Sequence, residues 1–259
     1  MNIKILTEDS HSHGLIPRIA RFREIAAGDV AASDSYAGIP IFAAKGLHAH
    51  AVDVMEHHGV LMRGTRVLEL ACGAGAMSQR LADRGLSVLA LDALPEAFKA
   101  THPSVRNRFA DLNGPFEIGL EKSCDLVVAL EIIAHLESPR AFLRACFACL
   151  KPGGHLFLTM PNVDSSYAVL SLALNGTFAR FDDNYLRQDG HIMPLVRHQF
   201  LAAAGDCGFQ VVMQQTFGED SISLRTWPKF WALLHMVRRL RSGTASEGAI
   251  AEYILRRPD

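Results

Sequence analysis

The chain contains 259 residues, of which 49% are hydrophobic and 20% charged, and its formal net charge is -1 at pH 7. A chain of this length and composition can bury a substantial core in one large domain, which excludes a disordered protein or a small disulfide-stapled scaffold. Because acidic and basic residues nearly balance, the chain has no overall field that would collect nucleic acid, and a charged partner must be met by a local patch.

The N-terminal part has the weakest pattern of the chain. Residues 1–45 are predicted to be an extension that covers the domain. Apolar residues at helical spacing begin only in segment 46–58, which predicts a helix that covers one face of the domain.

From Arg66 onward, strand and helix signals alternate. The strand signals are continuous apolar runs, which are typical of parallel strands covered on both faces. The predicted strands cover 66–71, 87–91, 106–110, 124–130 and 154–160. The predicted helices cover 76–84, a short segment from Pro95, and 139–150, with Ser138 as N-cap and Pro139 at the first position. This alternation predicts a doubly wound α/β fold.

After Pro161 the pattern changes. Residues 164–192 mix aromatic, polar and glycine residues too irregularly for one helix or one strand, and we interpret them as a lid. The elements predicted beyond the lid are a helix at 194–207 and strands at 209–217 and 251–257. Between these strands lies an insertion, 219–248, whose residues 227–241 combine aromatic and aliphatic bulk with basic residues and no acid. That composition predicts a basic amphipathic helix.

The cysteines and the N-terminus bear on the cellular compartment. Five cysteines, an odd number, do not form the even framework of a secreted disulfide-linked domain, and residues 1–8 contain no apolar signal core. We therefore expect a cytoplasmic protein. Cys146 and Cys149 fall among apolar residues of a predicted helix, which favours core packing over redox or zinc chemistry. No apolar run approaches the roughly 18 residues that span a bilayer, so membrane contact would be peripheral.

The most informative segment is 67–75, an apolar strand that runs into a glycine turn, with Glu69 inside the strand. Gly73 and Gly75 suit a backbone that turns sharply beneath a ligand, because a Cβ would obstruct the approach. The next predicted strand leads to Asp92, where a ribose diol would be held. These features predict a nucleoside-binding site.

A nicotinamide or flavin dinucleotide site is the competing interpretation of this turn. Two residues weaken it. Ser78 stands where the third glycine of the dinucleotide pattern would allow close packing of helix and strand, and Glu69 would add negative charge near a pyrophosphate. A ligand with a cationic and zwitterionic part would suit Glu69 better.

This segment resembles the first motif of the class I S-adenosylmethionine-dependent methyltransferases, with Ala71 in place of the commonest first glycine. The resemblance extends from about residue 46 to the end of the chain. Its further matches are the segments 91–92, 110–112, 124–136 and 150–162. It implies a methyltransferase domain at 46–259 with a Rossmann-like, doubly wound, seven-stranded sheet whose last strand is antiparallel.

The resemblance implies S-adenosylmethionine as the cofactor and S-adenosylhomocysteine as its product. Asp92 matches the acid that holds the adenosine ribose, and Asp111 and the backbone N–H of Leu112 match the groups that contact adenine. The cofactor-binding residues implied in this way are Glu69, Ala71, Cys72, Gly73, Gly75, Asp92, Ala93, Asp111, Leu112 and Leu130.

Methyl transfer from a sulfonium is an in-line displacement, so alignment supplies much of the rate. A hydroxyl nucleophile also needs a base or a metal to remove its proton. The catalytic candidates are Glu131, His135 and His191. Glu131 and His135, at i and i+4, share a face if the chain turns helical there, and His191 and His198 are expected to approach from the lid.

One branch of the family includes ubiquinone-pathway O-methyltransferases and small-RNA 2′-O-methyltransferases and binds a divalent metal through Glu-x-x-Glu-His. Here Ala134 replaces the second Glu and removes a ligand, so we predict no metal. His135 is then either the base or a residue that packs the loop, and His191 is similar to a lid histidine common in this branch.

We expect O-methylation of a small molecule, a sugar or a lipid-linked precursor. The alternatives are a catalytically idle or regulatory nucleoside-binding protein and a dinucleotide-dependent oxidoreductase. Nucleic acid is not expected as a partner, because only one basic stretch is evident and no stacking platform accompanies it.

The basic helix at 227–241 suggests a membrane partner. We expect Trp227, Phe230, Trp231 and Leu234 to enter an anionic surface, which would place the protein peripherally at the inner membrane. An intramolecular cover or a homodimer contact is the alternative interpretation of these side chains.

Overall fold

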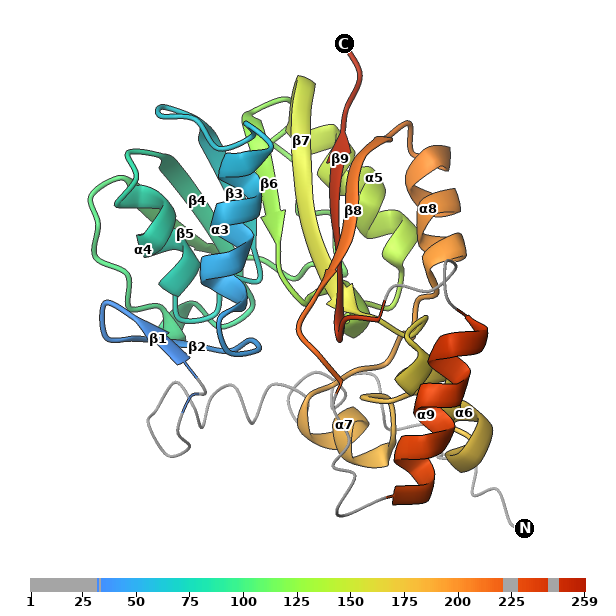
Figure 1. Cartoon of the computed structure of the whole chain (residues 1–259). Helices are drawn as coiled ribbons and strands as arrows, with labels where there is room; N and C mark the ends of the chain where they lie inside the picture. Colours follow the sequence, from blue (N-terminus) through green and yellow to red (C-terminus); the bar gives the residue numbers. More distant parts are fainter. Residues whose placement is uncertain (1–31, 33, 221–227, 242–246) are drawn as a thin grey trace, which may run out of the picture.

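The computed structural model describes residues 32, 34–220, 228–241 and 247–259, and a seven-stranded sheet forms its centre (Figure 1). The strand order is β5-β4-β3-β6-β7-β9-β8, with a separate hairpin β1-β2. The strands are β1 Asp34–Tyr36, β2 Ile39–Ile41, β3 Arg66–Leu70, β4 Ser87–Asp92, β5 Val105–Phe109, β6 Cys124–Ala129, β7 Leu150–Pro161, β8 Gln210–Phe217 and β9 Ile250–Arg256. Strands β3 to β7 pair in parallel, whereas β9 is antiparallel to both of its neighbours. The predicted sheet with an antiparallel last strand is confirmed.

Helices lie on both sides of this sheet (Figure 1). They are α3 Leu47–His57, α4 Ala76–Ala82, α5 Pro139–Cys149, α6 Ser166–Asn175, α7 Asp183–Gln188, α8 Arg197–Asp206 and α9 Pro228–Leu240, with short 3-10 helices η1 Pro95–Ala97 and η2 Ile133–His135. The predicted cap of α5 is confirmed, because the Ser138 side chain accepts a hydrogen bond from the backbone N–H of Ala141. The predicted helix over 46–58 is α3.

The central strand β6 explains why the fold is doubly wound. Its side chains alternate between the two faces of the sheet, and all are fully buried from Leu126 to Ala129. Leu126 belongs to the core formed with α3 and α4, which includes Met55. Val127 belongs to the opposite core formed with α5 and α8, which includes Phe142. A continuously apolar strand of this kind requires a helical layer on each face.

The hairpin β1-β2 was not predicted from the sequence. It packs against α4, where the Tyr36 hydroxyl donates a hydrogen bond to Asp83 over 2.8 Å. The Arg80 guanidinium also lies over the Tyr36 ring, 4.1 Å from its centroid. Most of the predicted extension at 1–45 lies outside the described residues. The hairpin belongs to the last part of that extension and lies beside the edge of the sheet that carries the glycine turn.

The lid and the basic insertion form helices α6, α7 and α9. Helix α9 packs against α6, so that Leu234 is only 1% exposed and the Phe230 ring lies 6.0 Å from the Tyr167 ring. The expectation that Leu234 enters a membrane is therefore wrong, because this side chain is buried within the protein, whereas Phe230 and Trp231 are half-buried. Trp227 lies outside the described residues.

The cysteines occupy the core. Cys146 and Cys149 are fully buried, and neither forms a disulfide, which confirms the prediction of core packing. Among the described helices, none is long and apolar enough to cross a bilayer.

Candidate functional site

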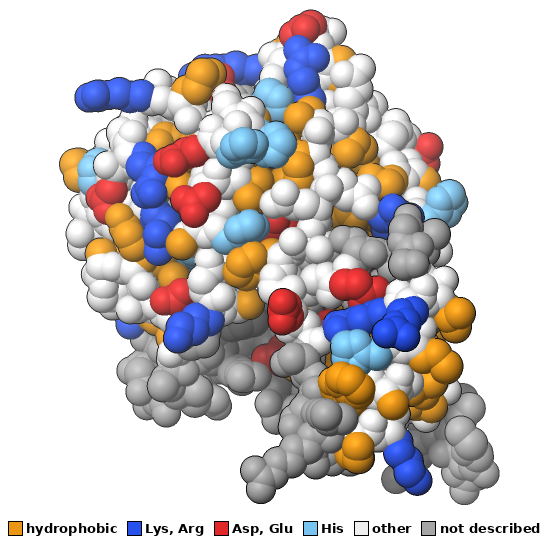
Figure 2. Space-filling view, in the orientation of Figure 1, with side chains coloured by type: hydrophobic (Ala, Val, Ile, Leu, Met, Phe, Trp, Pro, Cys, Tyr) orange, Lys and Arg blue, Asp and Glu red, His pale blue; other side chains and the backbone are white. Residues whose placement is uncertain are grey.

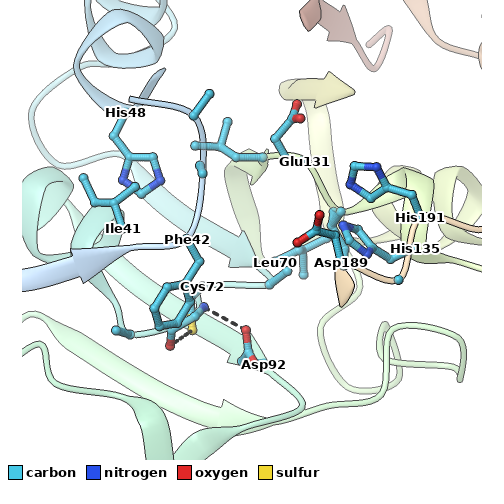
Figure 3. Close-up of a pocket in the computed structure, with 18 of the residues that line it drawn as sticks. Ile41, Phe42, His48, Leu70, Cys72, Asp92, Glu131, His135, Asp189 and His191 are labelled. Carbon is cyan, nitrogen blue, oxygen red and sulfur yellow. Dashed lines mark hydrogen bonds between the residues drawn. The ribbon is translucent and has the colours of Figure 1, made fainter. Parts of the chain in front are cut away.

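A cavity of about 930 Å³ opens at the carboxyl ends of β3, β4 and β6, the edge at which open α/β sheets bind ligands. Three parts of the chain enclose it (Figure 3). The segment 40–45 and the start of α3 form one wall, the strand ends form the floor, and the lid with residues 217–219 forms the remaining side.

The glycine turn follows β3 and has left-handed backbone angles. The φ angles of Ala71, Gly73 and Gly75 are 58°, 53° and 86°. A Cβ on Gly73 would lie 2.7 Å from the Phe42 ring, and one on Gly75 would lie 2.6 Å from the Phe98 ring. The conformation therefore favours glycine at both positions, and a Cβ at either one would force the Phe42 or Phe98 ring to shift. Ala71 and Gly73 line the cavity, whereas Gly75, predicted to bind the cofactor, is not among the lining residues, because Phe98 packs against it.

Asp92 at the end of β4 holds this turn in place. One carboxylate oxygen accepts a hydrogen bond from the backbone N–H of Gly73 over 2.8 Å, and the other accepts from the backbone N–H of Leu94, also over 2.8 Å (Figure 3). Burial raises the pKa of Asp92, against these backbone hydrogen bonds, which lower it. The carboxylate also lines the cavity, so the predicted ribose acid is placed beside the turn.

Glu69 lies beneath the turn and is only 4% exposed. Its carboxylate accepts a short hydrogen bond from the hydroxyl of Ser78. Burial raises the pKa of Glu69 to about 8, although the Ser78 hydrogen bond opposes the shift. Ser78, which replaces the third glycine of a dinucleotide pattern, therefore serves as the partner of the strand acid.

The other predicted cofactor residues also meet at this cavity. Asp111 is exposed, and its side chain accepts a hydrogen bond from the backbone N–H of Asn113 over 2.9 Å. Leu112 is 8% exposed, and Leu130 ends the floor beyond β6. The predicted residues that line the cavity from these strand ends are Cys72, Ala93, Asp111, Leu112 and Leu130.

Glu131 follows β6 with a φ of 56°. The Thr159 hydroxyl on β7 accepts a hydrogen bond from the Glu131 backbone N–H over 2.9 Å and donates one to the Glu131 carboxylate over 2.8 Å. Burial raises the pKa of Glu131 to about 7, while the Thr159 hydrogen bond and the charge of Arg180 oppose the shift. A carboxylate that lines the cavity is thus held ready to exchange a proton near neutral pH.

The expectation that Glu131 and His135 share one helical face is wrong. Glu131 has left-handed backbone angles, and the helix that follows, η2, is a single turn over Ile133–His135. The Glu131 backbone forms its hydrogen bonds with Thr159 on the neighbouring strand and does not enter that helix.

The lid places His191 against His135, with ring centroids 4.8 Å apart in an edge-to-face arrangement. Nδ1 of His191 lies 2.8 Å from the backbone carbonyl oxygen of Arg180. Burial and the neighbouring His191 lower the pKa of His135 to about 4, and burial also lowers the pKa of His191. Both rings are therefore neutral at pH 7. His198, by contrast, is exposed on α8 and does not line the cavity.

Ala134 occupies the position where a metal-binding relative would have a second Glu. Its carbonyl oxygen accepts hydrogen bonds from the backbone N–H groups of Ile192 and Met193, over 2.9 and 3.0 Å. The loop after β6 thus anchors the lid through its backbone. Within the described part of the chain, no group of three or more His, Cys, Asp or Glu side chains is placed to hold a metal ion.

Sequence reasoning missed two residues that line the cavity, Arg180 and His48, and one that supports it from β7, Thr159. Arg180 from the lid donates a hydrogen bond to Asp220 over 2.6 Å, and both lie in irregular segments that carry no motif. His48 lines the wall formed by α3. Thr159 did leave a signal, because it is a lone hydroxyl in the apolar run of β7.

Comparison with known proteins agrees with this geometry. Residues 40–214, more than half of the chain, match a family model described as a methyltransferase domain. A ubiquinone biosynthesis O-methyltransferase of Xanthomonas campestris pv. campestris (strain B100) is 34% identical over 131 residues, which cover 45% of this chain and 51% of that protein. Another of Xanthomonas axonopodis pv. citri (strain 306) is 34% identical over 127 residues, covering 44% and 49%. The chain spans about half the length of these curated relatives.

Solved structures share the fold at low sequence identity. An S-adenosylmethionine-dependent methyltransferase from Archaeoglobus fulgidus has a TM-score of 0.57 and 16% identity, covering 80% of this chain and 93% of that one. The [4+2]-cyclase SpnF has a TM-score of 0.55 and 16% identity, covering 99% and 98%. These likenesses establish the architecture, and the family model establishes the relationship. The chain belongs to the methyltransferase-domain family, among the class I S-adenosylmethionine-dependent methyltransferases.

Proposed function

We propose that the protein transfers the methyl group of S-adenosylmethionine to a hydroxyl oxygen of a small molecule, a sugar or a lipid-linked precursor. The observation that carries this proposal is the Glu131 carboxylate, which lines the cavity with a pKa raised by burial to about 7. A hydroxyl must lose its proton as it is methylated, and a general base is most effective when its pKa lies near the working pH.

The cofactor would lie along the carboxyl edge of the sheet. Asp92 would accept hydrogen bonds from the ribose hydroxyls, and Asp111 with the backbone of Leu112 would contact the adenine. When bound, the sulfonium supplies a methyl group that is already activated for transfer. The task left to the protein is to align the acceptor oxygen and to remove its proton.

Glu131 is the proposed base, and His135 and His191 are proposed to position the lid. Burial and the neighbouring His191 lower the pKa of His135 to about 4, although the backbone of Gly190, Glu131 and Asp189 opposes the shift. A base of that pKa would accept a hydroxyl proton poorly at neutral pH. Its edge-to-face contact with the His191 ring of the lid suits a structural role instead.

The lid side of the cavity favours a polar, uncharged acceptor. Arg180, Asn184, Tyr185 and Asp189 line it. Since the Arg180 guanidinium already forms an ion pair with Asp220, its charge is balanced, and hydroxyl groups of an acceptor could hydrogen-bond to the remaining side chains. The printed names of the curated relatives, ubiquinone biosynthesis O-methyltransferases, support oxygen as the methylated atom.

A second candidate function is cofactor binding without methyl transfer. The observation that favours it is the shared fold of SpnF, a [4+2]-cyclase, because one fold can support unrelated chemistry. The candidates differ in whether S-adenosylhomocysteine forms during incubation with an acceptor.

Calorimetry followed by an activity assay tests both candidates. We expect the whole chain to bind S-adenosylmethionine and S-adenosylhomocysteine but not NADH. With methyl-labelled cofactor and pools of hydroxylated small molecules, sugars and lipid-linked precursors, we expect label in a product and an unchanged rate in EDTA. Binding without transfer to any pool would favour the second candidate, binding of NADH alone would contradict the cofactor, and inhibition by EDTA would indicate a metal.

The surface of α6 and α9 supports a proposal about the membrane. Figure 2 shows hydrophobic side chains gathered with basic ones on the lobe that these helices form. Met236 is 51% exposed and Leu240 79%, and Lys229 lies on the same side of α9. Leu174 on α6 is 54% exposed. We propose that this α6–α9 surface contacts an anionic membrane from the cytoplasmic side, with a homodimer contact as the alternative.

Co-sedimentation with vesicles tests the α6–α9 surface. We expect the protein to pellet with vesicles rich in phosphatidylglycerol and not with phosphatidylcholine vesicles. The double variant Lys229→Ala/Leu240→Ser should pellet at least about tenfold less, because a surface basic residue contributes about 1 kcal/mol near an anionic membrane and each buried CH₂ about 0.8 kcal/mol. Met62→Ser, which changes a side chain 65% exposed elsewhere, serves as the control. Absence of pelleting together with a dimer in light scattering would favour the homodimer.

A further inference from the structure

The wall of the cavity formed by α3 contains a buried imidazole without a hydrogen-bond partner. His48 is 8% exposed and lines the cavity. Among the described residues, no group forms a hydrogen bond with its buried Nδ1 atom. In Figure 3 the ring points from α3 toward Ile41, the last residue of β2. Buried polar atoms nearly always have partners, so an unpaired one beside a cavity indicates a ligand atom.

The groups around His48 are engaged elsewhere. Asp34 accepts a hydrogen bond from the backbone N–H of Gly46 over 3.0 Å, which fixes the chain just before α3. Arg80 stacks on the Tyr36 ring. Burial and the charge of Arg80 lower the pKa of His48 to about 4. The ring is therefore neutral, with one nitrogen that donates and one that accepts.

The charges along the cavity suit a zwitterion at this wall. Lys45 lines the cavity beside His48, whereas Glu69 lines it from the strand side. In the proposed cofactor arrangement, Asp92 and Asp111 would hold the adenosine part, and Glu131 would act on the acceptor. The part that remains is the amino-acid arm, which carries a carboxylate and an ammonium. The ammonium group of Lys45 suits the carboxylate, and the carboxyl oxygens of Glu69 suit the ammonium as hydrogen-bond acceptors.

We propose that Nδ1 of His48 donates a hydrogen bond to the α-carboxylate of the cofactor's amino-acid arm. The inference rests on the proposed cofactor site and adds a binding residue that no motif marks. It also accounts for the unpaired Nδ1 atom of this buried imidazole, since the cofactor would supply a partner.

Titration calorimetry with two ligands tests this role in the whole chain. S-adenosylhomocysteine carries the amino-acid arm, whereas 5′-methylthioadenosine lacks it. We expect His48→Leu to weaken S-adenosylhomocysteine binding about tenfold or more, the size of one hydrogen bond to a charged group. Binding of methylthioadenosine should change less than about twofold. His48→Asn, whose amide can replace the Nδ1 donor, should recover part of the loss.

The controls separate the role of His48 from folding and from the cofactor site. His57→Phe alters an exposed histidine on the same helix and should leave both affinities unchanged. The unliganded His48→Leu variant should melt no lower than the wild type, because the change removes an unpaired buried polar atom. Equal loss for both ligands, or loss for neither, would overturn the proposal. Failure of the wild type to bind either ligand would overturn the cofactor site and this inference with it.

Discussion

Replacing Glu131 by Gln is expected to lower kcat about 100-fold or more, because general-base catalysis contributes about 10²- to 10⁴-fold. The amide keeps the shape of the side chain but cannot accept the acceptor's proton. The pH dependence of kcat tests the role of Glu131 independently. Burial raises the pKa of Glu131 to about 7, so the wild-type base gains its active, ionised form as pH rises. We expect kcat to increase through about pH 7 and to level above it, and the variant to lose this step.

Thr159 and His135 provide the matched variants for this measurement. The Thr159 hydroxyl stabilises the ionised carboxylate of Glu131, so Thr159→Val should move the midpoint of the kcat profile to higher pH. His135→Asn should leave the midpoint near pH 7, because the pKa of His135 is about 4. A step that persists in Glu131→Gln, or a wild-type midpoint near pH 4, would assign the base to another group.

The sheet could be predicted because continuous apolar runs in the local sequence indicate strands that are buried on both faces. In β6, the residues from Leu126 to Ala129 lie between the two helical layers, and all of them are apolar. The hairpin β1-β2 offered no such signal, since each of its strands has three residues. Its position depends on Tyr36, which meets Asp83 from 47 residues away. Short strands stabilised by distant contacts leave no periodicity to detect.

In the site, too, the features that depend on local sequence could be predicted, and those that depend on distant contacts could not. The glycine turn follows β3 and Asp92 ends the neighbouring parallel strand β4, so sequence spacing alone predicted their meeting. Glu131 was predicted to lie at the end of the fourth strand, where it is found, but its conformation depends on Thr159, which is 28 residues away. The inward face of α9 depends on its packing against α6. Local amphipathic spacing cannot tell which partner covers a helical face.

Replacing Asp92 by Ala is expected to weaken binding of S-adenosylhomocysteine about 100-fold or more. A hydrogen bond to a charged group contributes about 1.5–3 kcal/mol, and the ribose diol offers two donors. The variant should also melt several degrees lower without ligand, since the backbone N–H groups of Gly73 and Leu94 lose their acceptor. Calorimetry and thermal unfolding measure the two effects, and Asp53→Ala on the exposed side of α3 is the control.

The two effects of Asp92 can be separated with a ligand that lacks one ribose hydroxyl. If the carboxylate binds the diol, the wild type should prefer methylthioadenosine over its 2′-deoxy analogue by about tenfold, the size of one such hydrogen bond. Asp92→Ala should bind both ligands equally weakly, because the 2′-hydroxyl can favour binding through Asp92 only while the carboxylate is present to interact with it. If the variant kept the wild-type preference, Asp92 would act only by holding the backbone of Gly73, and the ribose would be recognised by a different group.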